Sequence, residues 1–432
     1  LCLKCIADMS TRSLQHGPLS YNLDPEGRLN RCGLRWEEIS ATAALGEYPQ
    51  NIGREKMTNK FGIGAALGAL MSLTALPAMA QELPDSMIWT SYDVGSAGYA
   101  EASAIADAFG KAFGTRVRIQ PSGSGIGRLQ PLLQGRADYA FLATEAFFLG
   151  EGAFDFATPE WGPVQLRAVA GRPAGITLIT AGDAGIKTVE DARGKRLAFV
   201  AGNPSVNVKC EAILAFGGLT LDDVEVIMFP TYSAAMASMT RNESDATCTT
   251  PTTSQLYELA ESPRGIFYPP LDPDNAAGWE SLLKVLPIMN PSDEDVAAGL
   301  AEGEIAKMAA YRYPVITTTE DKSADEVYAF IKALDESYDL YKDGTATMTR
   351  WALDQSGKPA MDVPFHEGAI RYLREKGIWT DEDQAWNDKR QARMDALSEA
   401  WAVFKPENGG LSEDAYAEAW MTRRSEVLST LN

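Results

Sequence analysis

Short apolar segments of strand length alternate with segments of helical period through the middle of this chain, and this alternation limits the fold more than any other feature. Residues 87–92 have the pattern of a strand, and residues 99–113 repeat apolar side chains at helical spacing. Further strands are expected over 116–120, 137–143, 165–171, 176–180, 196–201, 224–228 and 245–248. Such alternation is typical of α/β proteins with mostly parallel sheets.

The last third of the chain has a different pattern. Residues 324–342, 367–376 and 386–431 carry the helical period with little strand signal. We therefore expect a helical C-terminal extension added to the α/β part.

Charge and histidine content exclude several kinds of function. The 432 residues include 39 Lys and Arg against 59 Asp and Glu, for a net charge of −20. So acidic a chain repels phosphate backbones, and no nucleic-acid partner is expected. Two histidines, His16 and His366, cannot build a His-rich zinc site and give few candidates for a catalytic base. We therefore expect no enzyme activity, no metal and no cofactor.

Residues 57–80 have the three parts of a secretory signal peptide. A short basic segment after Met57 leads into the apolar run 61–76, and Ala78-Met79-Ala80 forms a cleavage site. The alternative is a membrane anchor, but the run is shorter than the roughly 20 residues that a span requires. We predict cleavage after Ala80 and export to the periplasm. Residues 1–56 are expected to lie upstream of the true start, outside the native protein.

Cysteine usage leaves one question open. Of the five cysteines, Cys210 and Cys248 follow the predicted cleavage site. An oxidising compartment permits a disulfide between them, and two buried free thiols are the alternative.

Four loops share one design: each follows an expected strand, is rich in Gly, Ser, Thr or Asn, and opens an expected helix. Free N–H groups and the positive end of a helix dipole suit a carboxylate at such loops. The carboxyl ends of strands, where these loops lie, are also the usual ligand side of an open α/β sheet. Plain helix capping is the alternative for each loop. The candidate ligand-binding residues on them are Tyr92, Gly95, Ser96, Gly98, Tyr99, Ser122, Gly123, Ser124, Asn203, Ser205, Asn207, Thr249 and Thr250.

Three further candidates lie outside these loops. Thr144 and Glu145 follow a strand end, where Glu145 would select an amino group or simply be solvated or cap a helix. Arg172 precedes Pro173 and would clamp a carboxylate with two hydrogen bonds, or form a surface salt bridge between lobes. His366 is expected to be structural.

Residues 119–141, reading IQPSGSGIGRLQPLLQGRADYAF, resemble the TAXI family of TRAP-transporter solute receptors. Matching stretches follow in the family's order at 166–170, 185–196, 218–223 and 364–372. The resemblance covers roughly residues 87–378, most of the predicted mature chain.

The resemblance implies a monomeric periplasmic binding protein of two α/β lobes. A small carboxylate, such as glutamate or 2-oxoglutarate, would bind between the lobes and pass to a TRAP membrane permease. The implied division is 81–173 for the first part of lobe I, 174–266 for lobe II, 267–385 for the rest of lobe I with hinge-crossing helices, and 386–432 for the extension. The alternatives are a receptor for an ABC transporter or a sensor kinase, and an exported hydrolase.

Overall fold

The computed structural model describes residues 83–431. The predicted signal peptide and the segment before it lie outside the described residues. Within residues 83–431, no helix has both the length and the apolar character that crossing a membrane requires.

Two parallel β-sheet units form the centres of two lobes. In lobe I, β1 (Ser86–Ser91) pairs with β2 (Arg116–Pro121) and β3 (Tyr139–Leu142). In lobe II, β5 (Arg196–Val200) pairs with β6 (Glu225–Phe229) and β7 (Ala246–Thr249). The strand order β2-β1-β3-β10-β4-β7-β5-β6 joins the two units through two long strands.

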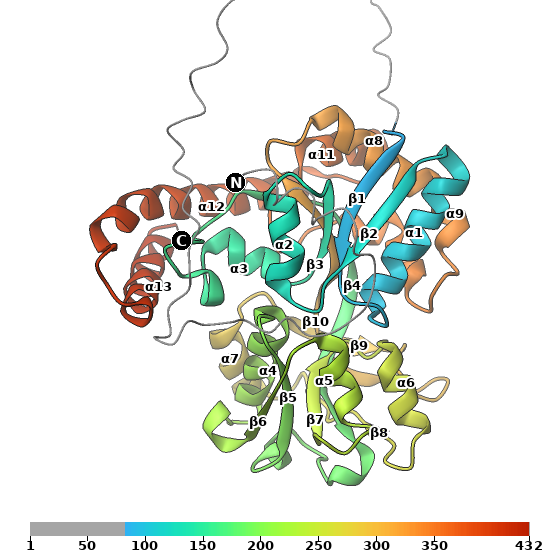
Figure 1. Ribbon diagram of the computed structural model, residues 1–432, viewed down its shortest axis with the longest axis vertical. Helices are drawn as coiled ribbons and strands as arrows, with labels where there is room; N and C mark the ends of the chain where they lie inside the picture. Colours follow the sequence, from blue (N-terminus) through green and yellow to red (C-terminus); the bar gives the residue numbers. More distant parts are fainter. Residues whose placement is uncertain (1–82, 432) are drawn as a thin grey trace, which may run out of the picture. The chain divides into compact units, whose positions relative to one another are not determined.

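These two strands, β4 (Leu166–Ala181) and β10 (Ala306–Thr319), run antiparallel to each other and cross between the lobes (Figure 1). β10 pairs with β3 at one end and with β9 (Asn290–Glu294) at the other. β4 pairs with β7 and with the short β8 (Ile266–Phe267). The strands predicted at 165–171 and 176–180 are therefore one strand.

The α/β class and the helical extension are confirmed, but the sheet is mixed rather than mostly parallel. Four strand pairs are parallel and five are antiparallel. The difference comes largely from β10, which was not predicted. It is buried on both faces and lacks the alternation of a half-exposed strand, and Pro314 interrupts the strand pattern.

Helices cover the sheet units. In lobe I these are α1 (Ala97–Phe113), α2 (Gly125–Leu133), α3 (Glu145–Glu151), α8 (Ala324–Glu336), α9 (Tyr338–Tyr341), α10 (Leu353–Ser356) and α11 (Glu367–Glu375). In lobe II they are α4 (Pro204–Phe216), α5 (Tyr232–Ser238), α6 (Ser254–Glu261) and α7 (Ala276–Val285).

The return from lobe II to lobe I comes later than predicted. The ring of Trp279 in α7 packs 5.7 Å from Phe216 in α4, so α7 belongs to lobe II. The second crossing is made by strand β10 and not by a helix after residue 267. The predicted boundary, which was taken from the family resemblance, therefore lies too early in the chain.

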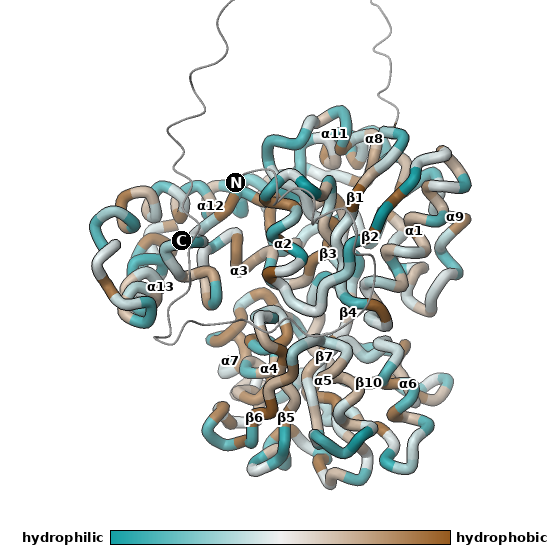
Figure 2. Tube along the Cα trace, in the orientation of Figure 1, coloured by the Kyte–Doolittle hydropathy of each residue, from teal (hydrophilic) through white to brown (hydrophobic). Residues whose placement is uncertain are grey.

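The C-terminal extension is a hairpin of α12 (Asp381–Asn408) and α13 (Glu413–Ser429). Figure 2 shows apolar residues interleaved with polar ones along both helices. Trp401 and Trp420 meet edge to face at 4.6 Å in a small core between them. Trp420 also donates from Nε1 to the Gly152 carbonyl at 2.7 Å, which attaches the hairpin to lobe I beside α3.

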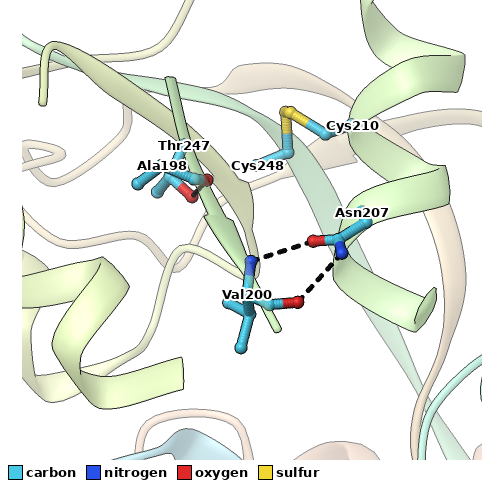
Figure 3. The surroundings of a disulfide bond; sticks show 6 residues. All are labelled: Ala198, Val200, Asn207, Cys210, Thr247 and Cys248. Carbon is cyan, nitrogen blue, oxygen red and sulfur yellow. Dashed lines mark hydrogen bonds between the residues drawn. A yellow bond between two sulfur atoms is a disulfide. The ribbon is translucent and has the colours of Figure 1, made fainter. Parts of the chain in front are cut away.

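Lobe II contains a disulfide between Cys210 of α4 and Cys248 of β7 (Figure 3). Of the two states left open by the sequence, the structure has the bonded one. Beside it, Asn207 bonds the backbone of Val200 through both ends of its amide, accepting at 3.0 Å and donating at 2.9 Å.

The disulfide is expected to stabilise lobe II measurably. It joins residues 38 positions apart, and a cross-link of this kind typically contributes about 2–4 kcal/mol. The Cys210→Ala/Cys248→Ala variant should lose that much unfolding free energy in a urea titration. Dithiothreitol should destabilise the wild type and leave the double variant unchanged. Two titratable thiols in unfolded, unreduced mature protein would contradict the bond.

Candidate functional site

The four predicted loops converge where the two lobes meet. The Gly125 N–H donates to the Gly202 carbonyl at 3.0 Å, linking the second loop to the third. The Ser254 N–H donates to the Gly95 carbonyl at 3.2 Å, linking the first loop to the fourth. The approach at Gly123 is so close that an added Cβ would lie 2.8 Å from Cβ of Thr231. The lobes are therefore closed on one another along these loops.

Most side chains of these loops serve the fold. Ser96, Ser124 and Asn203 each accept a backbone N–H as helix caps, at 3.1, 3.1 and 3.3 Å. Asn207 is engaged with Val200, and the Thr249 hydroxyl bonds the Tyr232 hydroxyl at 2.5 Å. Ser96, Ser124 and Asn203 therefore act as helix caps, which was the alternative to ligand binding. The Nδ2 group of Asn203 is buried and has no partner among the described residues.

The remaining loop residues pack rather than point outward. Tyr92 is 2% exposed, and a Cβ on Gly98 would meet the Tyr313 hydroxyl at 2.6 Å. Thr250 is also buried, whereas Tyr99 is half-buried. Loop residue Ser122 accepts through its carbonyl from Arg128 at 3.2 Å.

A buried ion pair lies directly behind the loops. Arg128 donates from Nε and Nη2 to Oε1 of Glu145 at 3.1 and 2.6 Å, and both side chains are fully buried. The Arg128 guanidinium also lies 3.2 Å above the ring of Tyr92. Arg128 lowers the pKa of Glu145 against the opposite effect of burial. Oε2 of Glu145 remains without a partner among residues 83–431, and it faces the interior rather than solvent.

Lys209 of α4 reaches from lobe II into the same interior. Its ammonium donates to Oγ1 of Thr144 in lobe I at 3.2 Å and to Oγ of Ser205 at 3.0 Å. It lies 4.0 Å above the ring of Tyr311. The side chain is 2% exposed, and burial lowers its pKa to about 7.

The charge of Lys209 is not matched by a contacting acid. In the described part of the chain, no carboxylate oxygen lies within 4.0 Å of its Nζ, unlike the nitrogens of Arg128. Burying an ammonium without a paired anion is costly. The acids that act on its charge are Glu145 and Asp362, which raise the pKa of Lys209 without contacting it. A contacting counter-charge is therefore missing at this place, the junction of the lobes.

Tyrosine rings enclose this place. Tyr92 packs edge to face against Tyr232 and Tyr313, with ring centres 5.2 and 5.5 Å apart, and Tyr311 stacks on Tyr313 at 5.8 Å. The Tyr232 hydroxyl is held by Thr249 and, at 2.7 Å, by Thr253. The packed rings place apolar surface around the buried charged groups.

Arg172 is not available as the predicted carboxylate clamp. Its Nε and Nη2 donate to the two oxygens of Glu101 at 2.7 and 2.5 Å, and both side chains are buried. Glu101 also accepts from Trp351 Nε1 at 2.7 Å. All these groups belong to lobe I, so the pair is neither a ligand clamp nor a surface bridge between lobes.

His366 has the structural role expected of it. Its Nδ1 accepts from the Gly368 N–H at 3.1 Å and caps α11, while Nε2 contacts the Lys322 carbonyl at 2.9 Å. With both ring nitrogens engaged, the one histidine in residues 83–431 does not form a Ser–His pair of the kind a hydrolase uses.

Comparison with protein families identifies the group to which the chain belongs. Residues 93–377 match the model described as the NMT1-like family. The chain belongs to the NMT1-like family. The matched span of this NMT1-like protein contains the four loops from Asp93 onward, the Arg128–Glu145 pair and Lys209. Tyr92 and the α12–α13 hairpin lie outside it. No curated protein sequence matches the chain.

Several solved structures are similar at low identity. The alkanesulfonate-binding protein of Xanthomonas axonopodis pv. citri, bound to MOPS, is 16% identical over 68% of this chain and 85% of its own, with a TM-score of 0.36. The periplasmic aliphatic sulphonate binding protein of Escherichia coli is 15% identical over 71% of this chain and 79% of its own, with a TM-score of 0.36. A binding protein component of an ABC phosphonate transporter from Pseudomonas aeruginosa is 11% identical over 80% of this chain and 97% of its own, with a TM-score of 0.40. None of these likenesses identifies what the present chain binds.

Proposed function

We propose that this NMT1-like protein is an exported solute receptor, not an enzyme, which encloses a small carboxylate between its lobes and delivers it to a membrane transporter. The observation that carries the proposal is Lys209, a buried ammonium from lobe II that contacts lobe I. Among the described residues, no carboxylate oxygen lies within 4.0 Å of its Nζ, although Glu145 and Asp362 act on its charge from farther away. A bound anion would supply the missing counter-charge and hold the lobes together.

Two unpartnered atoms in the same interior support a ligand with both acceptor and donor groups. The buried Nδ2 of Asn203 can donate to a carboxylate oxygen, and the buried Oε2 of Glu145 can accept from an amino group. Unsatisfied buried polar atoms are uncommon in native proteins and call for a partner. An amino acid offers both a carboxylate and an amino group, whereas a keto acid offers only the carboxylate.

The transporter could be of two classes. The resemblance of residues 119–141 implies a TRAP permease, while the Pseudomonas aeruginosa binding protein named above belongs to an ABC transporter. We take the ABC transporter as the first partner to test. Reconstituted uptake that requires ATP would identify an ABC permease, and uptake that requires an ion gradient would identify a TRAP permease.

A thermal-shift screen tests the proposed function. Carboxylates, amino acids and keto acids are compared with neutral sugars and metal cations. A ligand present at 100 times its Kd should stabilise the folded protein by roughly 2.7 kcal/mol, enough for a clear shift. Shifts with sugars or cations but with no carboxylate would contradict the proposal.

Ligand binding should also change the separation of the lobes. Tyr92, Asn203 and Ser205 on the loops are buried in the closed arrangement, so a ligand can reach them only if the lobes part about β4 and β10. We expect small-angle X-ray scattering to give a larger radius of gyration without ligand than with it. An identical scattering profile at saturation would show that binding does not involve hinge motion.

A further inference from the structure

A cavity of about 420 Å³ lies beside the buried charges, where the crossing strands meet the C-terminal extension. Lobe II contributes Ile288 and lobe I contributes Asp362, while Trp386 and Arg390 come from α12. Volumes of roughly 300–1,000 Å³ are usual for small-molecule sites. This space exceeds what a short dicarboxylate would fill.

Tyr311 connects the cavity to the proposed anion site. One face of its ring lies under the Lys209 ammonium at 4.0 Å, and the same residue lines the cavity. A ligand whose carboxylate meets Lys209 could therefore extend past Tyr311 into the cavity.

Asp362 gives the cavity a polar end. The side chain is 3% exposed, and its Oδ2 has no hydrogen-bond partner among the described residues. Burial raises the pKa of Asp362 to about 7, although Lys209, Arg390 and Arg312 act in the opposite direction. A buried, unpartnered carboxyl group of this kind is suited to accept from a hydroxyl or N–H group of a ligand.

The α12 residues are held in place by contacts with lobe I. Arg390 donates from Nε to the Asp362 carbonyl at 3.1 Å and from Nη1 to Oε1 of Glu151 at 3.2 Å. Its guanidinium also lies 4.6 Å from the ring of Phe147. Trp386, one helical turn earlier on α12, is thereby fixed as a partly exposed aromatic wall of the cavity.

From this geometry we infer that the C-terminal hairpin completes the ligand chamber and selects a carboxylate with a large aromatic body that carries a hydrogen-bond donor. The carboxylate meets Lys209, the aromatic body lies against Trp386 and Tyr311, and the donor meets Asp362. This inference rests on the proposed function and specifies its substrate class. It replaces the short dicarboxylates implied by the TAXI resemblance with a larger ligand.

Calorimetric titration with six probes tests this inference on the full mature protein. The probes are glutamate, 2-oxoglutarate, phenylalanine, tyrosine, phenylpyruvate and 4-hydroxyphenylpyruvate. We expect the aromatic probes to bind more tightly than the short ones, and the hydroxylated aromatics to bind most tightly. Trp386→Ala should weaken aromatic binding about tenfold or more, since buried Trp anchors commonly contribute at that level.

Two further variants give matched comparisons. Asp362→Asn should reduce the preference for tyrosine over phenylalanine at least threefold, since a neutral amide accepts a phenol hydrogen bond less strongly than a carboxylate. Val403→Ala, at a position on α12 that is 58% exposed, should leave every affinity unchanged. Circular dichroism checks that each variant is folded.

The outcomes separate the two proposals. Binding of short dicarboxylates alone, with Trp386→Ala silent, would overturn the inference about the cavity and leave the receptor function standing. If aromatic carboxylates bind but neither Trp386→Ala nor Asp362→Asn changes their affinity, the cavity is not their site. If no probe binds and the thermal-shift screen finds no anion, the receptor proposal itself fails.

Discussion

Lys209→Met is expected to abolish most of the affinity for the carboxylate ligand. Truncating one partner of a buried, hydrogen-bonded charge pair typically costs 2–5 kcal/mol, and the lower figure already corresponds to about thirtyfold in Kd. Methionine keeps most of the apolar stem of the side chain and removes the ammonium, together with its contact with the Tyr311 ring. Isothermal titration calorimetry of the wild type and the variant measures the change.

The same substitution should not harm the ligand-free fold. Because the ammonium is buried and no carboxylate oxygen in residues 83–431 lies within 4.0 Å of it, replacing it with an apolar group removes a desolvation cost. We expect the unfolding free energy of ligand-free Lys209→Met to equal or exceed that of the wild type. Lys284→Met, at a 70% exposed position paired with Glu280, serves as the control and should alter neither quantity. Unchanged ligand affinity in Lys209→Met, or strong destabilisation without ligand, would show that Lys209 is a structural residue.

Glu151→Gln is expected to cause the largest loss of stability. Glu151, at the end of α3, is fully buried and accepts from Arg390 at 3.2 Å, from Arg393 at 2.5 Å and from Arg424. One carboxylate of lobe I thus contacts both helices of the C-terminal hairpin. Removing one partner of a buried ion pair costs about 3–5 kcal/mol, because the remaining charges stay buried without compensation. Urea unfolding followed by tryptophan fluorescence measures this loss.

The acid sensitivity of the wild type should depend on the same residue. The arginines lower the pKa of Glu151 to about 2 from an ordinary value near 4.5. A carboxyl group with a lowered folded-state pKa stabilises the protein above its unfolded-state pKa, and this contribution disappears as the pH falls from about 4.5 towards 2. The Glu151→Gln variant should lack this part of the acid transition.

Glu426→Gln provides the matched control for these experiments. Glu426 pairs with Arg423 on α13, and the two side chains are 60% and 50% exposed. Exposed pairs contribute about 0–1 kcal/mol. Equal effects of Glu151→Gln and Glu426→Gln on stability would contradict a main role of Glu151 in attaching the hairpin to lobe I.

The sequence allowed the local elements and their loops to be predicted, because strand and helix periods depend on neighbouring residues. The helix predicted over 99–113 is an example, since the structure has a helix over Ala97–Phe113. Capping was given only as the alternative for the loops, and Ser96 and Ser124 take that role. β10 was missed because a strand buried on both faces has no alternation to detect. The lobe boundary near residue 267 came from the family resemblance and not from the strand pattern.

The site was harder to predict, since its charged residues come together only through tertiary structure. Glu145 was a candidate, but its partner Arg128 lies 17 residues earlier and carried no signal of its own. Lys209, by contrast, could have been noticed in the sequence. It is a lone lysine among the buried apolar residues Val206, Val208, Cys210 and Ala212 of α4. A charge at a core position of a helix is a reason to look for a functional partner.

Native mass spectrometry of gently purified mature protein tests the central claim most directly. If Lys209 holds an anion between the lobes, the wild type should retain a carboxylate through purification, and Lys209→Met should be recovered without it. A wild-type protein carrying a neutral sugar or a metal cation, or a Lys209→Met protein that retains the same carboxylate, would contradict the account.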